Sequence, residues 1–263
     1  MNNYRVESLL GEGAFATVNL VSDLRDGSFH ALKTLKKVSR SIQLILFKKE
    51  IAALKKIRDV CKPHLLCLEE IFEVNDTFSI LTNYVVGYNL EELKGSYIDL
   101  DFAENFLFQL LPVLEDLEKE KIAHRDIKKT NIIYNPVTQV FTIIDFGLSI
   151  INESSGYAGS PGYLSPTIMV HRANLASSIQ DWLRNDVFAL GVTLFIVLNE
   201  SRPYKITAGN PESSSHVDRL SKSDYNKPNP WKWNESKEIK NVVIAMLQDK
   251  YTASQIINLF YEG

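Results

Sequence analysis

The chain has 263 residues and nearly balanced charges, with 29 Lys and Arg against 32 Asp and Glu and a formal net charge of −3. Apolar residues make up 45%, aromatic residues 10% and charged residues 23%, which is average for a globular protein and excludes disordered, collagen-like and disulfide-scaffold classes. The small net charge gives no overall attraction to nucleic acid or to an anionic membrane. The length predicts one large domain or two fused lobes.

Cysteine usage and the start of the chain indicate where the protein works. Cys61 and Cys67 are six residues apart, which fits neither a disulfide framework nor the close spacing of a zinc site and favours a reducing environment. The first ten residues contain no basic region followed by an apolar run, so no secretory signal is expected. The uncharged stretch Val187–Asn199 is shorter than the roughly 20 residues that cross a bilayer, and it predicts a buried helix. We therefore expect a cytoplasmic protein with no membrane partner and no nucleic-acid partner.

The first third of the chain predicts a sheet with one helix. Its apolar and β-branched residues occur in short runs separated by turn signals, such as Arg25-Asp26-Gly27 and Asn75-Asp76. The run Ile42–Val60 instead has apolar residues at helical spacing, with lysines on the other face. The strands are expected at Tyr4–Leu10, Thr17–Val21, Phe29–Leu35, Leu66–Val74 and Thr77–Tyr84.

The pattern changes after Gly87, where helical spacing dominates. Phe102–Lys121 predicts a long amphipathic helix, and short strands are expected at Ile132–Tyr134 and Phe141–Ile144. The rest is mostly helical or looped, and the serine-rich patch Pro211–His216 predicts a surface loop. The expected fold class is α+β, with a five-stranded antiparallel first lobe that contains one helix and a mainly α second lobe.

A glycine-rich turn joins the first two predicted strands. The sequence GEGAFATV, Gly11 to Val18, would let backbone N–H groups approach a polyphosphate, because small residues leave open the space that side chains would fill. A hairpin turn that binds nothing explains the same residues. This segment alone does not decide between the two.

A lysine and a glutamate occur on faces that are otherwise apolar. Lys33 shares one face of its predicted strand with Phe29, Ala31 and Leu35, since side chains alternate along a strand. Glu50 falls within the apolar stripe of the predicted helix, where a carboxylate is costly without a cation. The two are expected to pair and to orient the ammonium toward phosphate oxygens. The alternative is that both head groups reach water at the edge of the stripe.

Two polar loops follow in the second lobe. HRDIKKTN, His124 to Asn131, lies between the long helix and a predicted strand, and Asp145-Phe146-Gly147 follows the next strand. Asn131 and Asp145 supply hard oxygen ligands that suit Mg2+, which also keeps waters and takes phosphate oxygens. Asp126 remains free to meet an incoming hydroxyl.

These motifs resemble the eukaryotic-type protein kinase catalytic domain, Ser/Thr branch, because GEGAFATV, the lysine of HALK, the glutamate of FKKEI, HRDIKKTN and DFG occur in family order. The resemblance covers essentially the whole chain. It implies a bilobal protein-kinase fold in one domain, residues 1–263, with the N-lobe at 1–84 and the hinge and C-lobe at 85–263. It also implies an ATP-dependent serine/threonine protein kinase, which is a phosphotransferase that uses Mg2+ and acts on a protein hydroxyl.

The resemblance implies a role for each motif residue. Asp126 would accept the proton of the substrate, Lys128 would offset charge on the transferred phosphoryl group, and Lys33, paired with Glu50, would contact the ATP phosphates. Asn131 and Asp145 would hold the metal. The rest of the ATP site would comprise the glycine turn, the adenine slot, the hinge and the position before the hinge: Leu10, Gly11, Gly13, Val18, Ala31, Thr82, Asn83, Val85 and Ile133.

The resemblance extends to the substrate-docking segment GSPGYLSP, Gly159 to Pro166. Lys128 and Ser160 are typical of the Ser/Thr branch. Asp186 matches an aspartate that braces the catalytic loop, although a helix cap would explain it locally. Glu91 and Glu92, just beyond the hinge, would either favour basic peptides or be exposed acids at a helix start.

Regulation is expected around Arg125, because kinases with this arginine often use it to bind a phosphorylated residue of the activation segment. Ser154, Ser155 and Tyr157 are the candidates. The segment is short, so it could instead order without modification.

Three positions depart from the family pattern. Ala16 replaces a glycine, Thr167 stands where a glutamate is usual, and Lys250 stands where its arginine partner is expected. Changing both members of a buried ion pair avoids leaving one charge unpaired. The competing functions are a pseudokinase scaffold that binds nucleotide or partners without efficient phosphotransfer, and a small-molecule kinase of similar fold.

Overall fold

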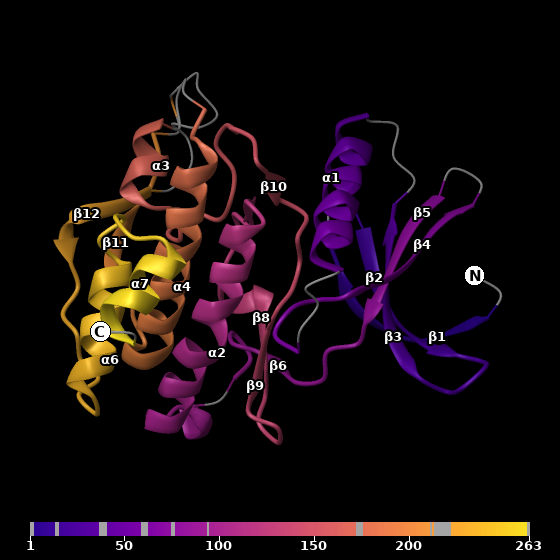
Figure 1. The fold of residues 1–263 in the computed structure, drawn as a ribbon, viewed down its shortest axis with the longest axis horizontal. Coiled ribbons are helices and arrows are strands. Elements are labelled where there is room, and N and C mark those ends of the chain that lie inside the picture. The colour runs from indigo at the N-terminus through magenta and orange to yellow at the C-terminus, as the bar shows by residue number, and fades with distance from the viewer. Residues whose placement is uncertain are drawn as a thin grey trace.

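The computed structural model describes residues 3–13, 16–36, 41–58, 63–74, 77–93, 95–171, 176–210, 212 and 222–261. This part of the chain forms a sheet-based lobe and a more helical lobe (Figure 1). The predicted α+β fold class is confirmed. Some sequence expectations lie outside the described residues: those on Cys61, on the turn Asn75-Asp76, on Ala14 and Phe15 of the glycine-rich turn, and on all of Pro211–His216 except Glu212.

The N-terminal lobe is a five-stranded antiparallel sheet with the order β1-β2-β3-β5-β4. Its register sets Lys33 opposite Ile80 and Ala31 opposite Thr82. The helix α1 lies on the face of the sheet that is turned toward the second lobe (Figure 1). The elements are β1 (Tyr4–Glu12), β2 (Ala16–Asp23), β3 (Phe29–Leu35), α1 (Ser41–Ile57), β4 (Leu68–Val74) and β5 (Thr77–Asn83).

Helix α1 packs through the apolar stripe that its sequence predicts. Phe47, Leu54 and Ile57 are all buried, at the spacing that puts residues on one helix face. Glu50 lies in the same stripe and is only 3% exposed. The alternative in which the Glu50 carboxylate reaches water is therefore wrong, because a cation meets it inside the protein.

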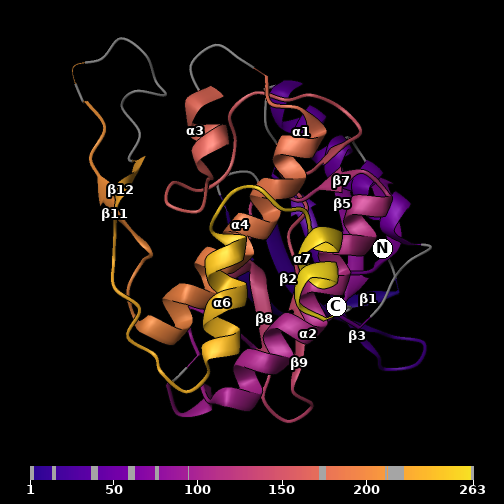
Figure 2. The same ribbon diagram turned by 60° about the vertical axis from the view of Figure 1, so that its left-hand side comes forward.

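The C-terminal lobe combines helices with short strands near the cleft. The strands form a sheet with the order β6-β8-β9 and two pairs, β10-β7 and β11-β12. Figure 2 shows α4 and α2 running through this lobe, with α6 and α7 against them. The elements are β6 (Tyr88–Asn89), the 3-10 helix Gly95–Tyr97, α2 (Leu100–Lys119), β7 (Ile122–Ala123), the 3-10 helix Lys129–Asn131, β8 (Ile132–Asn135), β9 (Val140–Ile143), β10 (Ile150–Ile151), α3 (Pro166–His171), α4 (Ile179–Asn199), β11 (Tyr204–Thr207), β12 (Lys222–Pro228), α6 (Lys237–Met246) and α7 (Ala253–Phe260).

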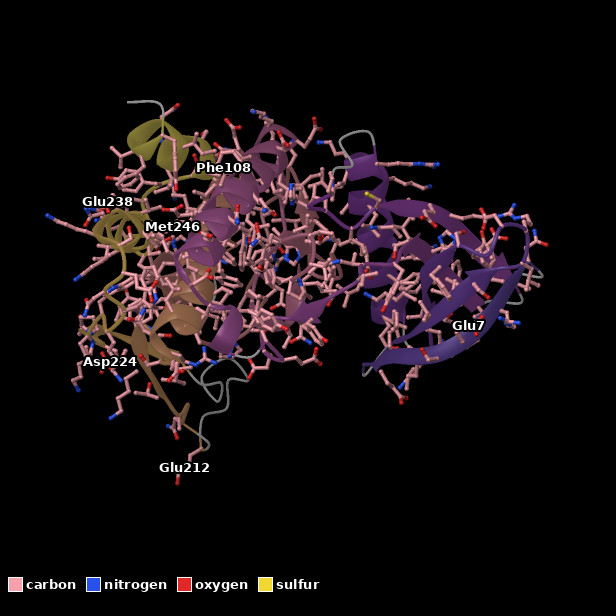
Figure 3. The ribbon with its side chains drawn as sticks, turned by 90° about the horizontal axis from the view of Figure 1, so that it is seen from below. Glu7, Phe108, Glu212, Asp224, Glu238 and Met246 are labelled. Atoms are coloured by element: carbon pink, nitrogen blue, oxygen red, sulfur yellow. The ribbon has the colours of Figure 1, made fainter. Side chains whose placement is uncertain are left out.

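Helix α4 is the centre of the second lobe, and the predicted buried stretch is its C-terminal part. The helix begins after Ser178, whose side chain forms a capping box with Asp181. At Gly191 an added Cβ would lie 2.8 Å from the Cβ of Met246, the buried α6 residue that Figure 3 labels. A glycine is required there because α4 and α6 approach too closely for any side chain.

The hairpin β11-β12 departs from the predicted mainly helical second lobe, as do the two-residue strands β6, β7 and β10. It lies at the outer edge of that lobe (Figure 2). Tyr204 of β11 stacks on Phe188 of α4, and Tyr225 of β12 donates a hydrogen bond to the carbonyl of Leu164. Sequence reasoning missed the hairpin because β11 has only four residues and β12 is mostly polar, with a single aromatic residue and no alternation of apolar and polar positions.

The lobes meet at a second place besides the hinge that follows β5. The segment before β4 pairs with the end of β9: Ile143 N–H donates to the His64 carbonyl at 2.9 Å, and Leu66 N–H donates to the Ile143 carbonyl at 3.1 Å. Lys56 at the end of α1 also forms an ion pair with Glu120, 3.2 Å from its carboxylate. These contacts fix the C-terminal end of α1 to the helical lobe.

Two expectations about the setting of the protein can be compared with the structure. Within the described ranges, no helix is long and apolar enough to cross a membrane. Cys67 is disulfide-bonded, so the expectation that the cysteines form no disulfide is wrong for this residue. Six-residue spacing leaves enough chain for such a bond, and spacing alone therefore could not exclude it.

Asp249 provides a contact at the place where Thr167 and Lys250 depart from the family pattern. The backbone N–H of Thr167 donates to the carboxylate of Asp249 at 2.8 Å, which links the start of α3 to the loop between α6 and α7. Lys250 is exposed. A carboxylate that receives a backbone N–H thus holds the end of the activation segment where the family pattern has an ion pair.

We expect Asp249→Gly to lower the free energy of unfolding by about 1–2 kcal/mol, because the Thr167 N–H loses its acceptor. Asp249 has a φ of 57°, which glycine adopts without strain, so this substitution isolates the lost hydrogen bond. Asp249→Asn keeps an oxygen acceptor and tolerates the same φ, and it should be close to wild type. Urea unfolding of the three proteins measures the difference, and equal stability of the Gly and Asn variants would refute the link.

Candidate active site

A cavity of about 700 Å3 lies between the lobes. The glycine turn and β3 line it from the N-terminal lobe, and Asn131, Ile133 and Asp145 line it from the C-terminal lobe. Every residue expected in the ATP site contributes to its wall: Leu10, Gly11, Gly13, Val18, Ala31, Lys33, Thr82, Asn83, Val85 and Ile133. One cavity therefore brings together residues that are far apart in the sequence.

The glycine turn is held in a narrow hairpin. Gly13 N–H donates to the Ala16 carbonyl at 2.9 Å, and Gly11 pairs with Val18 across β1 and β2. An added Cβ would meet nothing within 4 Å at Gly11 and only the Ala16 carbonyl, at 3.7 Å, at Gly13. The glycines leave open space on the cavity side rather than relieving a steric clash, which is the property a phosphate-binding turn needs.

Lys33 is the ionic centre of the cavity. Its ammonium nitrogen lies 2.6 Å from Glu50 Oε1 of α1 and 3.0 Å from Asp145 Oδ1. Burial by itself would lower the pKa of Lys33, but the two carboxylates outweigh it and raise the pKa above its usual value. Burial likewise opposes the charge of Asp145, and Lys33 nevertheless lowers its pKa. Lysine and aspartate are therefore both charged at neutral pH.

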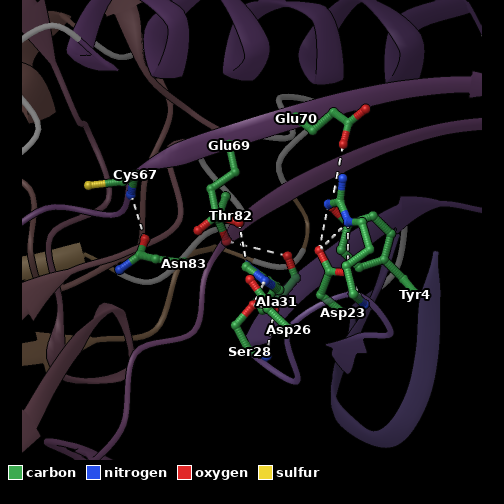
Figure 4. Close-up of polar contacts among 12 residues, drawn as sticks. Tyr4, Asp23, Asp26, Ser28, Ala31, Cys67, Glu69, Glu70, Thr82 and Asn83 are labelled. Atoms are coloured by element: carbon green, nitrogen blue, oxygen red, sulfur yellow. Dashed lines mark hydrogen bonds and ion pairs between the residues drawn. The ribbon is translucent and has the colours of Figure 1, made fainter.

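The start of the hinge is fixed by polar contacts that Figure 4 shows. The Asn83 side chain accepts the Cys67 N–H at 2.7 Å, and the Asn83 N–H donates to the Cys67 carbonyl at 3.1 Å. The Thr82 hydroxyl donates to the Ala31 carbonyl at 3.4 Å. The backbone N–H of Asn83 is already bonded to Cys67. A backbone N–H that donates to a ligand at the hinge must therefore belong to a residue after Asn83.

Asp186 of α4 holds the catalytic-loop motif through backbone hydrogen bonds. Its buried carboxylate accepts the backbone N–H groups of His124 at 2.6 Å and Arg125 at 2.8 Å. Burial raises the pKa of Asp186 to about 7, against the two N–H donors that favour its charged form. Helix α4 begins at Ile179, so the alternative that Asp186 caps a helix is wrong.

His124 joins the two polar loops. Its Nδ1 accepts the Asp126 N–H at 3.2 Å, and its Nε2 lies 3.0 Å from the Ile144 carbonyl. Burial lowers the pKa of His124, so the ring is neutral with its proton on Nε2. This tautomer fixes Asp126 relative to Asp145, the residue that follows Ile144, and sequence reasoning missed it because the histidine touches no ligand.

Asp126 lies at the centre of a compact polar group. Lys128 Nζ is 2.7 Å from its Oδ2, and the Ser160 hydroxyl donates to its Oδ1 at 2.8 Å. Lys128 also donates to Ser160 at 2.9 Å, which closes a triangle. Asn131 Nδ2 donates to Asp126 at its carbonyl, 2.9 Å, and at its Oδ2, 3.2 Å. A base, a cation and the docking segment therefore meet beside the cavity.

The oxygens expected to hold Mg2+ fit that ion in chemistry and placement. Asn131 uses its Nδ2 on Asp126, and its amide oxygen accepts only a long hydrogen bond, 3.5 Å, from the Thr130 hydroxyl. Asp145 uses only Oδ1 on Lys33. Both residues line the cavity. The described residues contain no cluster of three or more His, Cys, Asp or Glu that could hold a metal without help. This agrees with an ion that takes its other ligands from phosphate and water.

Arg125 binds the activation segment in its unmodified form. It donates to the Ser155 hydroxyl at 2.8 Å and to the Gly156 carbonyl at 2.9 Å, and its guanidinium lies 4.3 Å from the ring centre of Trp182. Burial lowers the pKa of Arg125 to about 10. Ser155 is also paired with Ser177 by two backbone hydrogen bonds. These contacts connect the segment around Ser155 to the catalytic-loop arginine and to Ser177.

Comparisons with known proteins agree with this geometry. The family model "Protein kinase domain" matches residues 4–258. Serine/threonine-protein kinase cds1 of Schizosaccharomyces pombe is 30% identical over 242 residues, which cover 85% of this chain and 50% of that protein. Calcium/calmodulin-dependent protein kinase type 1B of Homo sapiens is 28% identical over 267 residues, covering 97% of this chain and 73% of that protein.

A solved structure shows the same fold. The Cydia pomonella granulovirus kinase PK-1 superposes with a TM-score of 0.75 at 22% identity, over 97% of this chain and 93% of that one. This chain belongs to the protein kinase family. It spans about half the length of the S. pombe kinase.

The space behind Thr82 generates a prediction. Thr82 is 5% exposed and shares the cavity with Leu54, Leu66 and Ile80, so the cavity extends past it toward α1. We expect an inhibitor whose aryl group enters this space to bind Thr82→Met more weakly by about 2 kcal/mol or more, because the added bulk occupies it. A parent compound without the aryl group should bind both proteins equally. Calorimetric titration of both compounds against both proteins measures the affinities. Equal affinity of the aryl compound for the two proteins would contradict the placement of Thr82 at this space.

Proposed function

We propose that the protein is an ATP-dependent serine/threonine protein kinase that transfers the γ-phosphate of ATP to a protein hydroxyl. One observation supports this most strongly: Lys33 and Asp145 are paired at 3.0 Å on the wall of a cavity that Asn131 also lines, and Asn131 donates a hydrogen bond to Asp126 beside that cavity. Phosphate-binding charges and a candidate base are thus adjacent. Phosphoryl transfer requires mainly such positioning and charge stabilisation.

The proposed roles follow from the contacts. Lys33, held by Glu50, orients the phosphates from the side of the N-terminal lobe, while the glycine turn offers backbone N–H groups above them. Asn131 and Asp145 hold Mg2+, which bridges phosphate oxygens and neutralises developing charge when it is bound. Asp126 accepts the proton of the incoming hydroxyl, and Lys128 stabilises the negative charge of the group being transferred. The adenine lies between Val18, Ala31 and Ile133.

A protein hydroxyl of Ser or Thr is the proposed acceptor. Ser160 of the docking segment contacts both Asp126 and Lys128, so the segment that would receive a peptide is joined to the reacting groups. A small-molecule kinase has no need of this connection. A pseudokinase would share the cavity, and it differs in turnover.

We expect Lys33→Met and Asp126→Asn each to lower phosphorylation of a mixed Ser/Thr peptide library by at least about a hundredfold, since each removes a group that acts in the transition state. Radiolabel transfer from ATP, with and without chelation of Mg2+, measures this. The surface variant Asp101→Asn is the matched control, and circular dichroism confirms folding. A wild type that binds ATP without transfer, or a folded Lys33→Met protein with full activity, would overturn the proposal.

We also propose that phosphorylation of the activation segment is not required for activity. The Arg125 contacts order the segment in the unmodified chain, and a second contact holds it against α1. Lys49, the neighbour of Glu50, lies 2.6 Å from Glu153 Oε1. Glu153 supplies a permanent negative charge next to Ser154 and Ser155, the positions where a phosphate is expected.

Phosphatase treatment and the double variant Ser154→Ala/Ser155→Ala are therefore expected to leave the rate within about threefold of wild type. Lys49→Glu should lower the rate by up to about fivefold, the effect of a half-exposed pair, and adding Glu153→Lys should restore it. Lys55→Glu, an exposed position on the same helix, is the charge control. A rate that collapses after phosphatase treatment would show that the segment does need its phosphate.

We also propose a cytoplasmic location, because the proposed reaction consumes ATP.

A further inference from the structure

A cation that the proposed reaction does not use lies next to the substrate-docking segment. Around the acceptor position, charges otherwise occur in pairs. Lys128 pairs with Asp126 at 2.7 Å, and Lys129 pairs with Glu91 at 2.6 Å. Glu91 is thereby neutralised, and Glu92 lines the nucleotide cavity. The acids beyond the hinge therefore do not form a free negative surface for a basic peptide.

Arg202 is the unpaired charge next to this segment. It follows α4, and its guanidinium carbon lies 5.1 Å from the ring centre of Tyr163. Among the described residues no carboxylate pairs with it; its side chain hydrogen-bonds Tyr163, while its NH1 is a buried donor with no acceptor. The residue as a whole is half-buried, so part of its surface remains accessible.

The contact with the docking segment is direct. A Cβ on Gly162 would lie 2.7 Å from Arg202 NH1 and 2.5 Å from Ile206 Cδ1, and Gly162 has a φ of 86°. Only glycine fits, so the guanidinium and the backbone of the segment are in close contact. Gly162 is two residues after Ser160, whose hydroxyl meets Asp126. Arg202 therefore stands beside the path of any peptide that presents a hydroxyl to Asp126.

The physical state of Arg202 favours an anionic partner. The Arg202 guanidinium has one hydrogen-bonded neighbour, Tyr163, and no carboxylate partner among the described residues, so its positive charge is only partly compensated and a carboxylate or phosphate at its accessible edge would compensate it. Stacking on Tyr163 holds the planar group in place before binding, so less side-chain freedom is lost when a ligand arrives. Arginine then binds a carboxylate through two parallel hydrogen bonds.

We propose that Arg202 determines substrate specificity by binding an acidic side chain of the peptide, close in sequence to the Ser or Thr that is phosphorylated. The inference rests on the proposed kinase function and names its substrate class. The acidic residue adds no step to the reaction. It fixes the peptide on the docking segment while Asp126 receives the hydroxyl.

The test uses alanine-based peptides with one serine, in which Glu or Gln is placed in turn at each of the three positions on either side. For the wild type we expect one position at which Glu raises kcat/KM about tenfold over Gln, mainly through KM, the size of one charge-assisted hydrogen-bonded contact. The preference should shrink at high ionic strength. In Arg202→Gln it should vanish, while the Gln peptides are phosphorylated as by wild type.

Two further variants make the result specific to the charge. Arg202→Lys should keep a reduced preference for Glu, and Arg202→Glu should reverse it in favour of Lys at the same position. Equal turnover of Glu and Gln peptides at all positions, or a preference for Lys in the wild type, overturns the inference and leaves the kinase function intact. A Glu preference that persists in Arg202→Gln also overturns it. If the wild type phosphorylates no peptide at all, the proposed function fails and the inference fails with it.

Discussion

The charge of the Lys33 ammonium is the constraint on which the site depends. Strand β3, helix α1 and the loop after β9 are separate in the sequence, and each supplies one member of the group Lys33, Glu50 and Asp145. A buried carboxylate such as Glu50 is tolerated only while the lysine is beside it, because an unpaired buried charge costs about 3–5 kcal/mol. The position of α1 against the sheet and the position of the loop that contains Asp145 are therefore set by the same atom, Lys33 Nζ.

The sequence predicted the elements with strong periodicity and the motifs whose residues act directly. Strand β3 has the predicted bounds, and the stripe through Phe47, Leu54 and Ile57 fixed the buried face of α1. It could not predict contacts made by backbone groups. Asp249 accepts a hydrogen bond from the backbone N–H of Thr167. Every residue except proline has such an N–H, so the identity of residue 167 does not predict this bond. The hairpin β11-β12 was missed for a related reason: β12 is mostly polar, and its partner β11 has four residues and packs on α4 through Tyr204.

Three charged side chains around the candidate site bind uncharged groups rather than an opposite charge. Asp186 and Asp249 each accept backbone N–H groups, and Arg125 meets a hydroxyl, a carbonyl and an indole ring. Such contacts are less sensitive to salt than surface ion pairs and have stricter geometry. They hold the loop around Arg125, the segment around Ser155 and the start of α3 in place.

The pairing of His64 and Leu66 with Ile143 has a consequence for how the lobes move. A body attached at one point can swing in any direction, whereas one attached at two points rotates only about the line between them. The hinge after β5 and this backbone pairing are two such points, as the separate crossings between the lobes in Figure 1 show. The ion pairs Lys56–Glu120, Lys33–Asp145 and Lys49–Glu153 join the lobes as well. Any opening of the cleft that keeps the backbone pairing must therefore break ion pairs at the cavity, so the width of its mouth and the charge state of its wall change together.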